Sequence, residues 1–176
     1  ARCMGMTTQT AHLVYDGVPA ATLRSIRASA CDQFGNVLFV RTAAGGEPLR
    51  CCLRLARAGD SIALIAFQPA GTGGPYAEIG PLFIHTEPCA EEPSRTEFPA
   101  DFRDRRAVLR PYDADGQMLD GVLAESGESE RLLPEMFADP AVQTVQVRNV
   151  IAGCWNFTVR RAADAEAPPD SDQTRK

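Results

Sequence analysis

The sequence predicts an α+β domain: a mostly antiparallel twisted sheet or partly rolled β-barrel with about two helices. Three observations predict it. Short segments rich in β-branched and aromatic residues recur along the chain, separated by Gly, Pro and Asp turns. Apolar residues recur at helical spacing in two stretches. Hydrophobic residues make up 44% of the 176 residues, enough to build a core.

The first half of the chain predicts one helix among several strands. Pro19 suits a first helical turn, and apolar residues then recur at helical spacing up to about Cys31. The segment 61–67 (SIALIAF) is almost wholly apolar, which favours a central strand. Proline removes a hydrogen-bond donor, so the strand at 76–85 is expected to be interrupted at Gly80-Pro81. The other strands expected here are 12–15, 36–42 and 49–55.

The second half predicts a hairpin, a helix and two closing strands. A polar stretch at 86–104 reads as a surface loop, and Asp113–Gly116 is a good hairpin turn. Ser126 or Ser129 is a suitable cap for a helix that runs to about Ala138. The expected strands are 106–112, 118–123, 142–147 and 154–160, the last with Trp155, Phe157 and Val159 on one face.

The domain organisation follows from these elements. We expect a flexible leader at 1–10, one globular domain at 11–161 and a disordered polar tail at 162–176.

Composition excludes several classes of function. The net charge of -5 without a basic stripe argues against nucleic acid as a partner. No apolar run approaches the roughly 20 residues of a membrane span, and no signal peptide is visible, so we expect a cytoplasmic protein without a membrane partner. The single lysine, Lys176, lies in the polar tail, which leaves no donor for Schiff-base or phosphate-loop chemistry. No organic cofactor motif is present.

Six cysteines are spread over the chain, and in a cytosol they are expected to be reduced thiols. If Cys51 and Cys52 lie on the expected strand, their side chains point to opposite faces.

Four blocks of sequence carry a resemblance. They are CLR with GD (52–60), PYAEIGPLFIHTEPC (75–89), LRPYDADGQMLDG (109–121) and FADPAVQTVQVRNVIAGC (137–154). With them, the chain resembles the bacterial family numbered 1203 among domains of unknown function, over about residues 14–161. The resemblance implies a fold and no established activity. Members often carry a cysteine at the position of Leu49, so the family's Cys-x-x-Cys pair with Cys52 is absent here.

One candidate site is a zinc cage. His85 and Cys89 have spacing that suits two zinc ligands, and Cys52 and Cys154 could complete a set of four. Against it, the four residues come from three distant segments, and a histidine at a strand end is commonly only hydrogen-bonded.

A second candidate site is catalytic. Cys89 or Cys154 would be the nucleophile and His85 its base, since a thiolate needs a nearby imidazole or cation. Arg148 would bind a carboxylate or phosphate, Asn149 would donate to an oxyanion, and Tyr76 would line the pocket. The competing interpretation is that the cysteines are buried small hydrophobes.

Three functions therefore stay open. The favoured hypothesis is a protein that acts on or binds a small molecule, as an enzyme without a cofactor. The alternatives are a noncatalytic ligand-binding or regulatory module and a zinc-stabilised structural domain. The substrate and the oligomeric state do not follow from the sequence.

Overall fold

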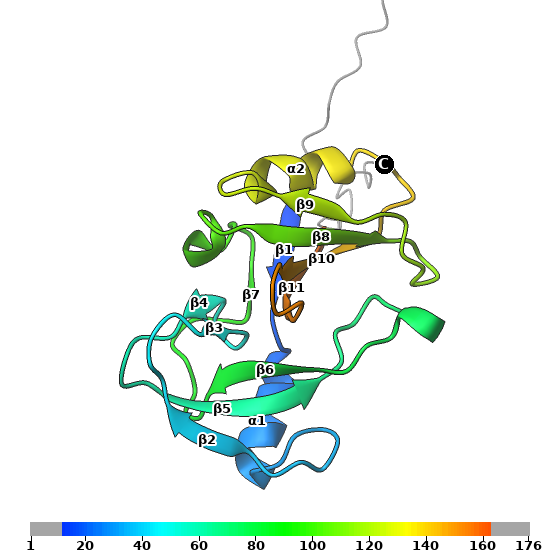
Figure 1. Ribbon diagram of the computed structural model, residues 1–176. Helices are drawn as coiled ribbons and strands as arrows, with labels where there is room; N and C mark the ends of the chain where they lie inside the picture. Colours follow the sequence, from blue (N-terminus) through cyan, green and yellow to red (C-terminus); the bar gives the residue numbers. More distant parts are fainter. Residues whose placement is uncertain (1–11, 163–176) are drawn as a thin grey trace, which may run out of the picture.

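The computed structural model describes residues 12–162 and shows two sheets, one above the other (Figure 1). The expected leader at 1–10, and all of the expected tail except Ala162, lie outside the described residues. The α+β class, the antiparallel sheets and the two α-helices are confirmed, and the sheets are open rather than closed into a barrel. The single domain at 11–161 stays a prediction.

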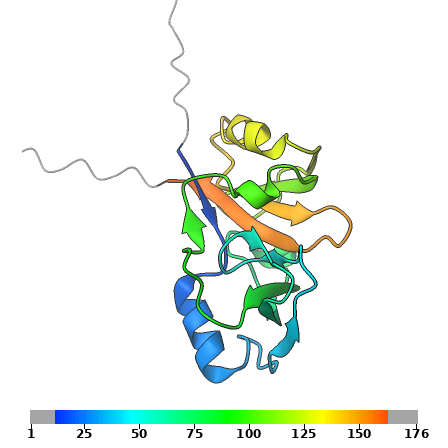
Figure 2. The same cartoon turned by 90° about the vertical axis from the view of Figure 1, so that its left-hand side faces the viewer.

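The upper sheet has six strands in the order β7-β1-β11-β10-β8-β9. The strands that come first and last in the sequence, β1 and β11, pair with Leu13 opposite Arg161 and so lie side by side (Figure 2). The strands are β1 (Leu13–Asp16), β7 (Ser94–Arg95), β8 (Ala107–Tyr112), β9 (Val122–Ala124), β10 (Thr144–Asn149) and β11 (Trp155–Arg161).

The lower sheet has five strands in the order β2-β5-β6-β3-β4. The apolar β5 is confirmed as a central strand, between β2 and β6. The strands are β2 (Phe39–Thr42), β3 (Pro48–Leu49), β4 (Arg54–Leu55), β5 (Ser61–Phe67) and β6 (Gly80–His85).

Four expected strands differ most from the structure. The strand expected at 118–123 is β9, which begins only at Val122, after an isolated bridge from Met118 to Tyr112. The strand expected at 49–55 is wrong: β3 and β4 are two residues each, and the chain reverses between them. The strand expected at 36–42 begins at Phe39, after an isolated bridge from Val37 to Cys31. The strand expected at 76–85 begins at Gly80 and keeps Pro81, while a 3-10 turn, η1 (Gly74–Tyr76), precedes it.

The two helices lie at opposite ends of the molecule (Figure 2). α1 (Ala20–Ser29) follows Pro19 and buries Leu23 and Ile26. α2 (Ser129–Met136) buries Leu133. Within residues 12–162, no helix has both the length and the apolar character that crossing a membrane requires.

The core has two parts, one for each sheet. The upper part centres on Phe157, which meets Phe102 edge-on at 5.3 Å, and Phe98 at 6.0 Å between ring centroids. Both partners come from the stretch 86–104, which was expected to be a surface loop and instead contributes to the core, partly through a 3-10 turn, η2 (Ala100–Phe102). Trp155 leaves the predicted stripe and packs on Phe67 of the lower core, where the pairing of β10 and β11 shifts register.

Asp32 holds the loop after α1 against β5. Its buried carboxylate accepts hydrogen bonds from the backbone N–H groups of Phe34 (2.9 Å), Asn36 (3.0 Å) and Ala66 (2.8 Å). Burial alone would raise the pKa of Asp32, but the hydrogen bonds from Asn36, Ala66 and Phe34 outweigh it, and the pKa lies below its ordinary value.

Replacing Asp32 with alanine is expected to destabilise the fold by about 2 kcal/mol at pH 7, because three N–H groups lose their acceptor. A carboxyl with a lowered folded pKa stabilises fully above its unfolded pKa of about 3.9, and that contribution is lost as the pH falls through the folded value. Urea unfolding should therefore show a larger difference from wild type at pH 7 than at pH 3. The exposed Asp104→Ala variant is the control, and a difference that grows toward acid would contradict the assignment.

Candidate functional site

A turn between β3 and β4 brings two adjacent cysteines to one side of the chain. Residues 50–53 form this turn, and Leu53 completes it with a positive φ of 53°. Cys51 and Cys52 are both buried, and their sulfurs lie 4.0 Å apart. The expectation that they point to opposite faces fails because a turn has no strand alternation.

The end of β6 places a histidine against these sulfurs. β6 runs parallel to β3, with Phe83 opposite Leu49, so His85 arrives beside the turn. The Nδ1 atom of His85 lies 3.6 Å from Cys51 Sγ and 3.9 Å from Cys52 Sγ. Cys89, four residues later, returns to the same point, 3.2 Å from His85 Nδ1 and 3.3 Å from Cys51 Sγ.

These four ligand atoms, which we call the Cys₃His cluster, all lie within 4.8 Å of one another. Zinc binds sulfur at about 2.3 Å and imidazole nitrogen at about 2.0–2.1 Å, so neighbouring ligand atoms of a tetrahedral site are roughly 3.5–3.8 Å apart. The five separations given above run from 3.2 to 4.0 Å. The cluster therefore has the size of a tetrahedral zinc cage.

The groups around the cluster suit a metal as well. His85 Nε2 faces Asp60 Oδ2 at 3.3 Å, an arrangement that leaves Nδ1 free to bind a metal. The backbone N–H of His85 donates to Cys51 Sγ at 3.2 Å. Arg27 Nη2 lies 3.9 Å from Cys89 Sγ and also donates to the carbonyl of His85. Three thiolates around a Zn²⁺ ion would leave one net negative charge, which the cationic side chain of Arg27 would balance.

Titration of the cluster follows from the same contacts. The pKa of Cys51 is lowered by its hydrogen bonds with Cys52 and Cys89. The pKa of Cys89 is raised to about 11, chiefly by its hydrogen bond with Cys51. The pKa of His85 is raised by its contact with Cys51 and further by Asp60.

Cys154 lies outside the Cys₃His cluster. Of the four zinc ligands considered from the sequence, Cys52, His85 and Cys89 meet, and Cys51 takes the fourth place. Cys154 precedes β11 in the upper sheet, where its sulfur accepts hydrogen bonds from Asn149 Nδ2 (2.9 Å) and Arg50 Nη2 (3.4 Å).

Arg50 connects the two sheets. Its guanidinium donates to the carbonyls of Trp155 (2.8 Å) and Pro48, and to Asn156 Oδ1 at 3.2 Å. The side chain is 1% exposed, and this burial lowers its pKa to about 10, so it is a cation at neutral pH. This role could not be predicted from the sequence, since an arginine beside two cysteines has no characteristic spacing.

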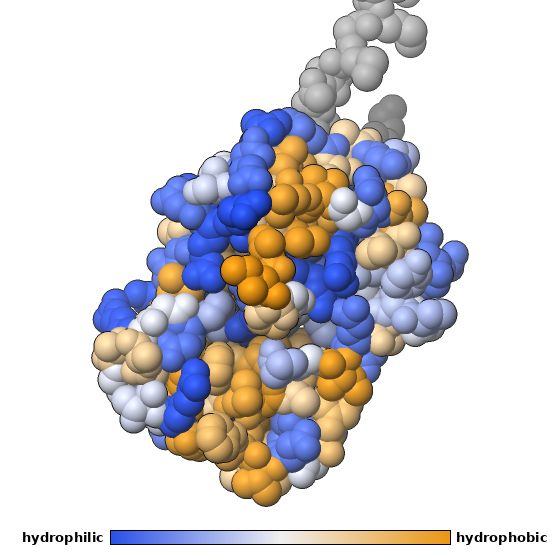
Figure 3. Space-filling model, in the orientation of Figure 1, coloured by the Kyte–Doolittle hydropathy of each residue, from blue (hydrophilic) through white to orange (hydrophobic). Residues whose placement is uncertain are grey.

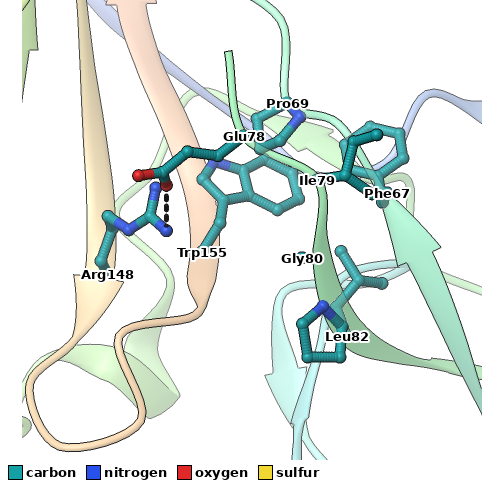
Figure 4. A pocket seen from close by; sticks show the side chains of 9 residues that line it. Phe67, Pro69, Glu78, Ile79, Gly80, Leu82, Arg148 and Trp155 are labelled. Carbon is teal, nitrogen blue, oxygen red and sulfur yellow. Dashed lines mark ion pairs between the residues drawn. The ribbon is translucent and has the colours of Figure 1, made fainter. Parts of the chain in front are cut away.

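The remaining predicted residues lie elsewhere. Arg148 forms an ion pair with Glu78 at 2.6 Å and donates to the carbonyl of Gly153. This pair borders a cavity of about 210 Å³ beside Trp155 (Figure 4). The ring of Tyr76 packs on Tyr112, 6.3 Å between centroids. The residues expected to line one pocket are therefore distributed over separate places.

Comparison with known proteins gives one match. No curated protein and no solved structure matches this chain. Residues 46–161 match a family described as "Protein of unknown function (DUF1203)". The resemblance expected over 14–161 is thereby confirmed over a shorter segment, which contains all four cluster residues, Arg50 and Cys154. The chain belongs to the DUF1203 family.

Proposed function

We propose that this is a zinc-binding protein in which Cys51, Cys52, His85 and Cys89 hold one structural Zn²⁺. The observation that carries the proposal is the convergence of three thiols and one imidazole at tetrahedral spacing. Three sulfurs and one nitrogen form a ligand set that favours zinc over calcium or magnesium, which take oxygen ligands.

The site suits a structural rather than a catalytic metal. Catalytic zinc keeps one position for water, whereas four protein ligands close the coordination sphere. Cys51 and Cys52 are 1% exposed, which leaves little access for a substrate. The metal would fasten the β3–β4 turn to the end of β6 and to the loop that follows. Thiols must stay reduced for this role, which fits a cytoplasmic protein.

Metal analysis of the purified protein tests the proposal. We expect about one zinc per chain, and Co²⁺ in its place should give the strong visible absorption of a tetrahedral thiolate site. Cys52→Ser and Cys89→Ser should lose the metal and the absorption. Cys31→Ser and Cys154→Ser should keep both, and the second of these controls separates this ligand set from one that includes Cys154. Well below one metal per chain, with no Co²⁺ spectrum, would refute the proposal.

A second candidate function is nucleophilic catalysis by Cys89. The observation that favours it is the line from Cys89 Sγ through His85 to Asp60, with contacts of 3.2 and 3.3 Å. A nucleophile, a base and an orienting carboxylate are arranged in this way in cysteine hydrolases. The two functions are separable: a zinc-bound Cys89 resists iodoacetamide, while a catalytic Cys89 in a metal-free protein reacts rapidly.

A further inference from the structure

A separate cavity of about 590 Å³ lies between the two sheets, at the loop that joins β10 to β11. The lower sheet contributes the apolar lining residues Leu64, Leu82 and Phe83, and the exposed Ile151 of the β10–β11 loop also borders the cavity. Hydrophilic and apolar surfaces meet at this junction (Figure 3). The size is typical of small-molecule sites, which occupy about 300–1,000 Å³.

The charge of this lining is unusual for an acidic protein. Arg50, Arg105 and Arg106 border the cavity, and no carboxylate does. Each of the other four cavities described for residues 12–162 includes at least one carboxylate. The net charge of the chain is -5, so an excess of cations at one cavity is a local feature.

Two of the three arginines have no carboxylate partner within the described chain. Arg50 is buried and bonded only to carbonyls, an amide oxygen and the sulfur of Cys154. Arg105 is half-buried, 6.0 Å from the ring centroid of Phe102, and forms no ion pair among residues 12–162. Arg106 is paired with Glu125 at 2.8 Å. A buried cation without a counter-ion is costly, and an anion in the cavity would offset that cost.

A thiol faces the same cavity. Cys154 belongs to the lining, and two N–H donors, from Asn149 and Arg50, point at its sulfur. The cavity thus combines arginines, apolar residues and a thiol whose alkylation can report on binding.

We propose that this cavity binds a small organic acid: its carboxylate lies near Arg105 and Arg50, and its apolar body lies along Leu64, Leu82 and Phe83. The site is independent of the zinc proposal, since it uses none of the cluster's ligands. Cys154 is adjacent to the bound carboxylate.

Alkylation of Cys154 tests this with a matched pair of reagents. Iodoacetate and iodoacetamide are close in size and differ in charge, and each forms an S–C bond, expels iodide and sends the thiol proton to solvent. We expect the ratio of the iodoacetate rate to the iodoacetamide rate to be about tenfold higher at Cys154 than at Cys31. A tenfold change corresponds to about the free energy of one charge-assisted hydrogen bond. Trypsin separates the two cysteines, on the peptides 149–160 and 28–41, so mass spectrometry reads both rates in one sample.

Variants and a competitor complete the test. Arg105→Gln should lower the iodoacetate-to-iodoacetamide rate ratio at Cys154 toward the ratio at Cys31. Arg103 pairs with Glu130 at the surface, so Arg103→Gln should leave the ratio at Cys154 unchanged. Octanoate should protect Cys154, and neutral octanamide should protect it far less. Equal ratios at the two cysteines, no effect of Arg105→Gln, or equal protection by octanoate and octanamide would overturn the proposal. Cys51, Cys52 and Cys89 lie on other tryptic peptides, so failure of the zinc proposal would be seen separately.

Discussion

Removing the metal with a chelator is expected to lower the midpoint of thermal unfolding by about 10 °C. A ligand that binds only the folded state stabilises it by about 4 kcal/mol at a free concentration 1,000 times its Kd, and each kcal/mol shifts the midpoint of a domain of this size by about 2–4 °C. The domain should still fold, because the upper core contains none of the cluster's residues and the lower core buries many apolar side chains besides Cys51 and Cys52. Scanning calorimetry with and without EDTA, followed by addition of zinc, measures the shift.

Two variants make this result specific to the Cys₃His cluster. Cys89→Ser should unfold at the lower midpoint and show no response to EDTA. Cys31→Ser should respond as wild type does, since Cys31 lies outside the cluster. If the wild-type midpoint is the same with EDTA and with added zinc, the metal does not stabilise the fold.

Replacing Arg50 with alanine is expected to destabilise the protein by about 3–5 kcal/mol. The substitution leaves buried acceptors on Trp155, Pro48 and Asn156 without their donor, and each unsatisfied buried group costs about 1–3 kcal/mol. The side chain also fills space between the two sheets, so a cavity would add to the loss. Urea unfolding measures the free-energy difference.

Arg54→Ala is the matched control, four residues along the chain. Arg54 pairs with Glu91 at the surface, where an ion pair contributes about 0–1 kcal/mol. A loss for Arg50→Ala no greater than that for Arg54→Ala would show that the buried guanidinium does not hold the sheets together.

Local patterns predicted the longer elements well. The apolar run at 61–67 is β5, and the helical spacing after Pro19 is α1, because each pattern matches the period of the structure formed. The core role of the stretch 86–104 was not predictable in this way. Phe98 and Phe102 stand alone among polar residues, and only their packing on Phe157 from a distant strand buries them.

The candidate metal centre was predicted in part. The spacing of His85 and Cys89 indicated two ligands, and Cys52 joins them. Cys51 was missed because the segment from Leu49 to Leu55 reads as one strand, in which neighbouring side chains diverge. Only the reversal at residues 50–53 turns both sulfurs toward His85. Cys154 was assigned to the cluster since sequence alone does not show which of two sheets a strand joins.

The pairing of β1 with β11 has a consequence for synthesis on the ribosome. β1 lies between β7 and β11, so the upper sheet cannot be completed until the last strand has been made. Every strand of the lower sheet, and all four cluster residues, precede residue 90. Contacts between segments close in sequence form fastest, so the strands of the lower sheet can pair, and the proposed zinc site can form, while the nascent chain is still growing. The lower core is completed later, when Trp155 at the start of β11 packs on Phe67.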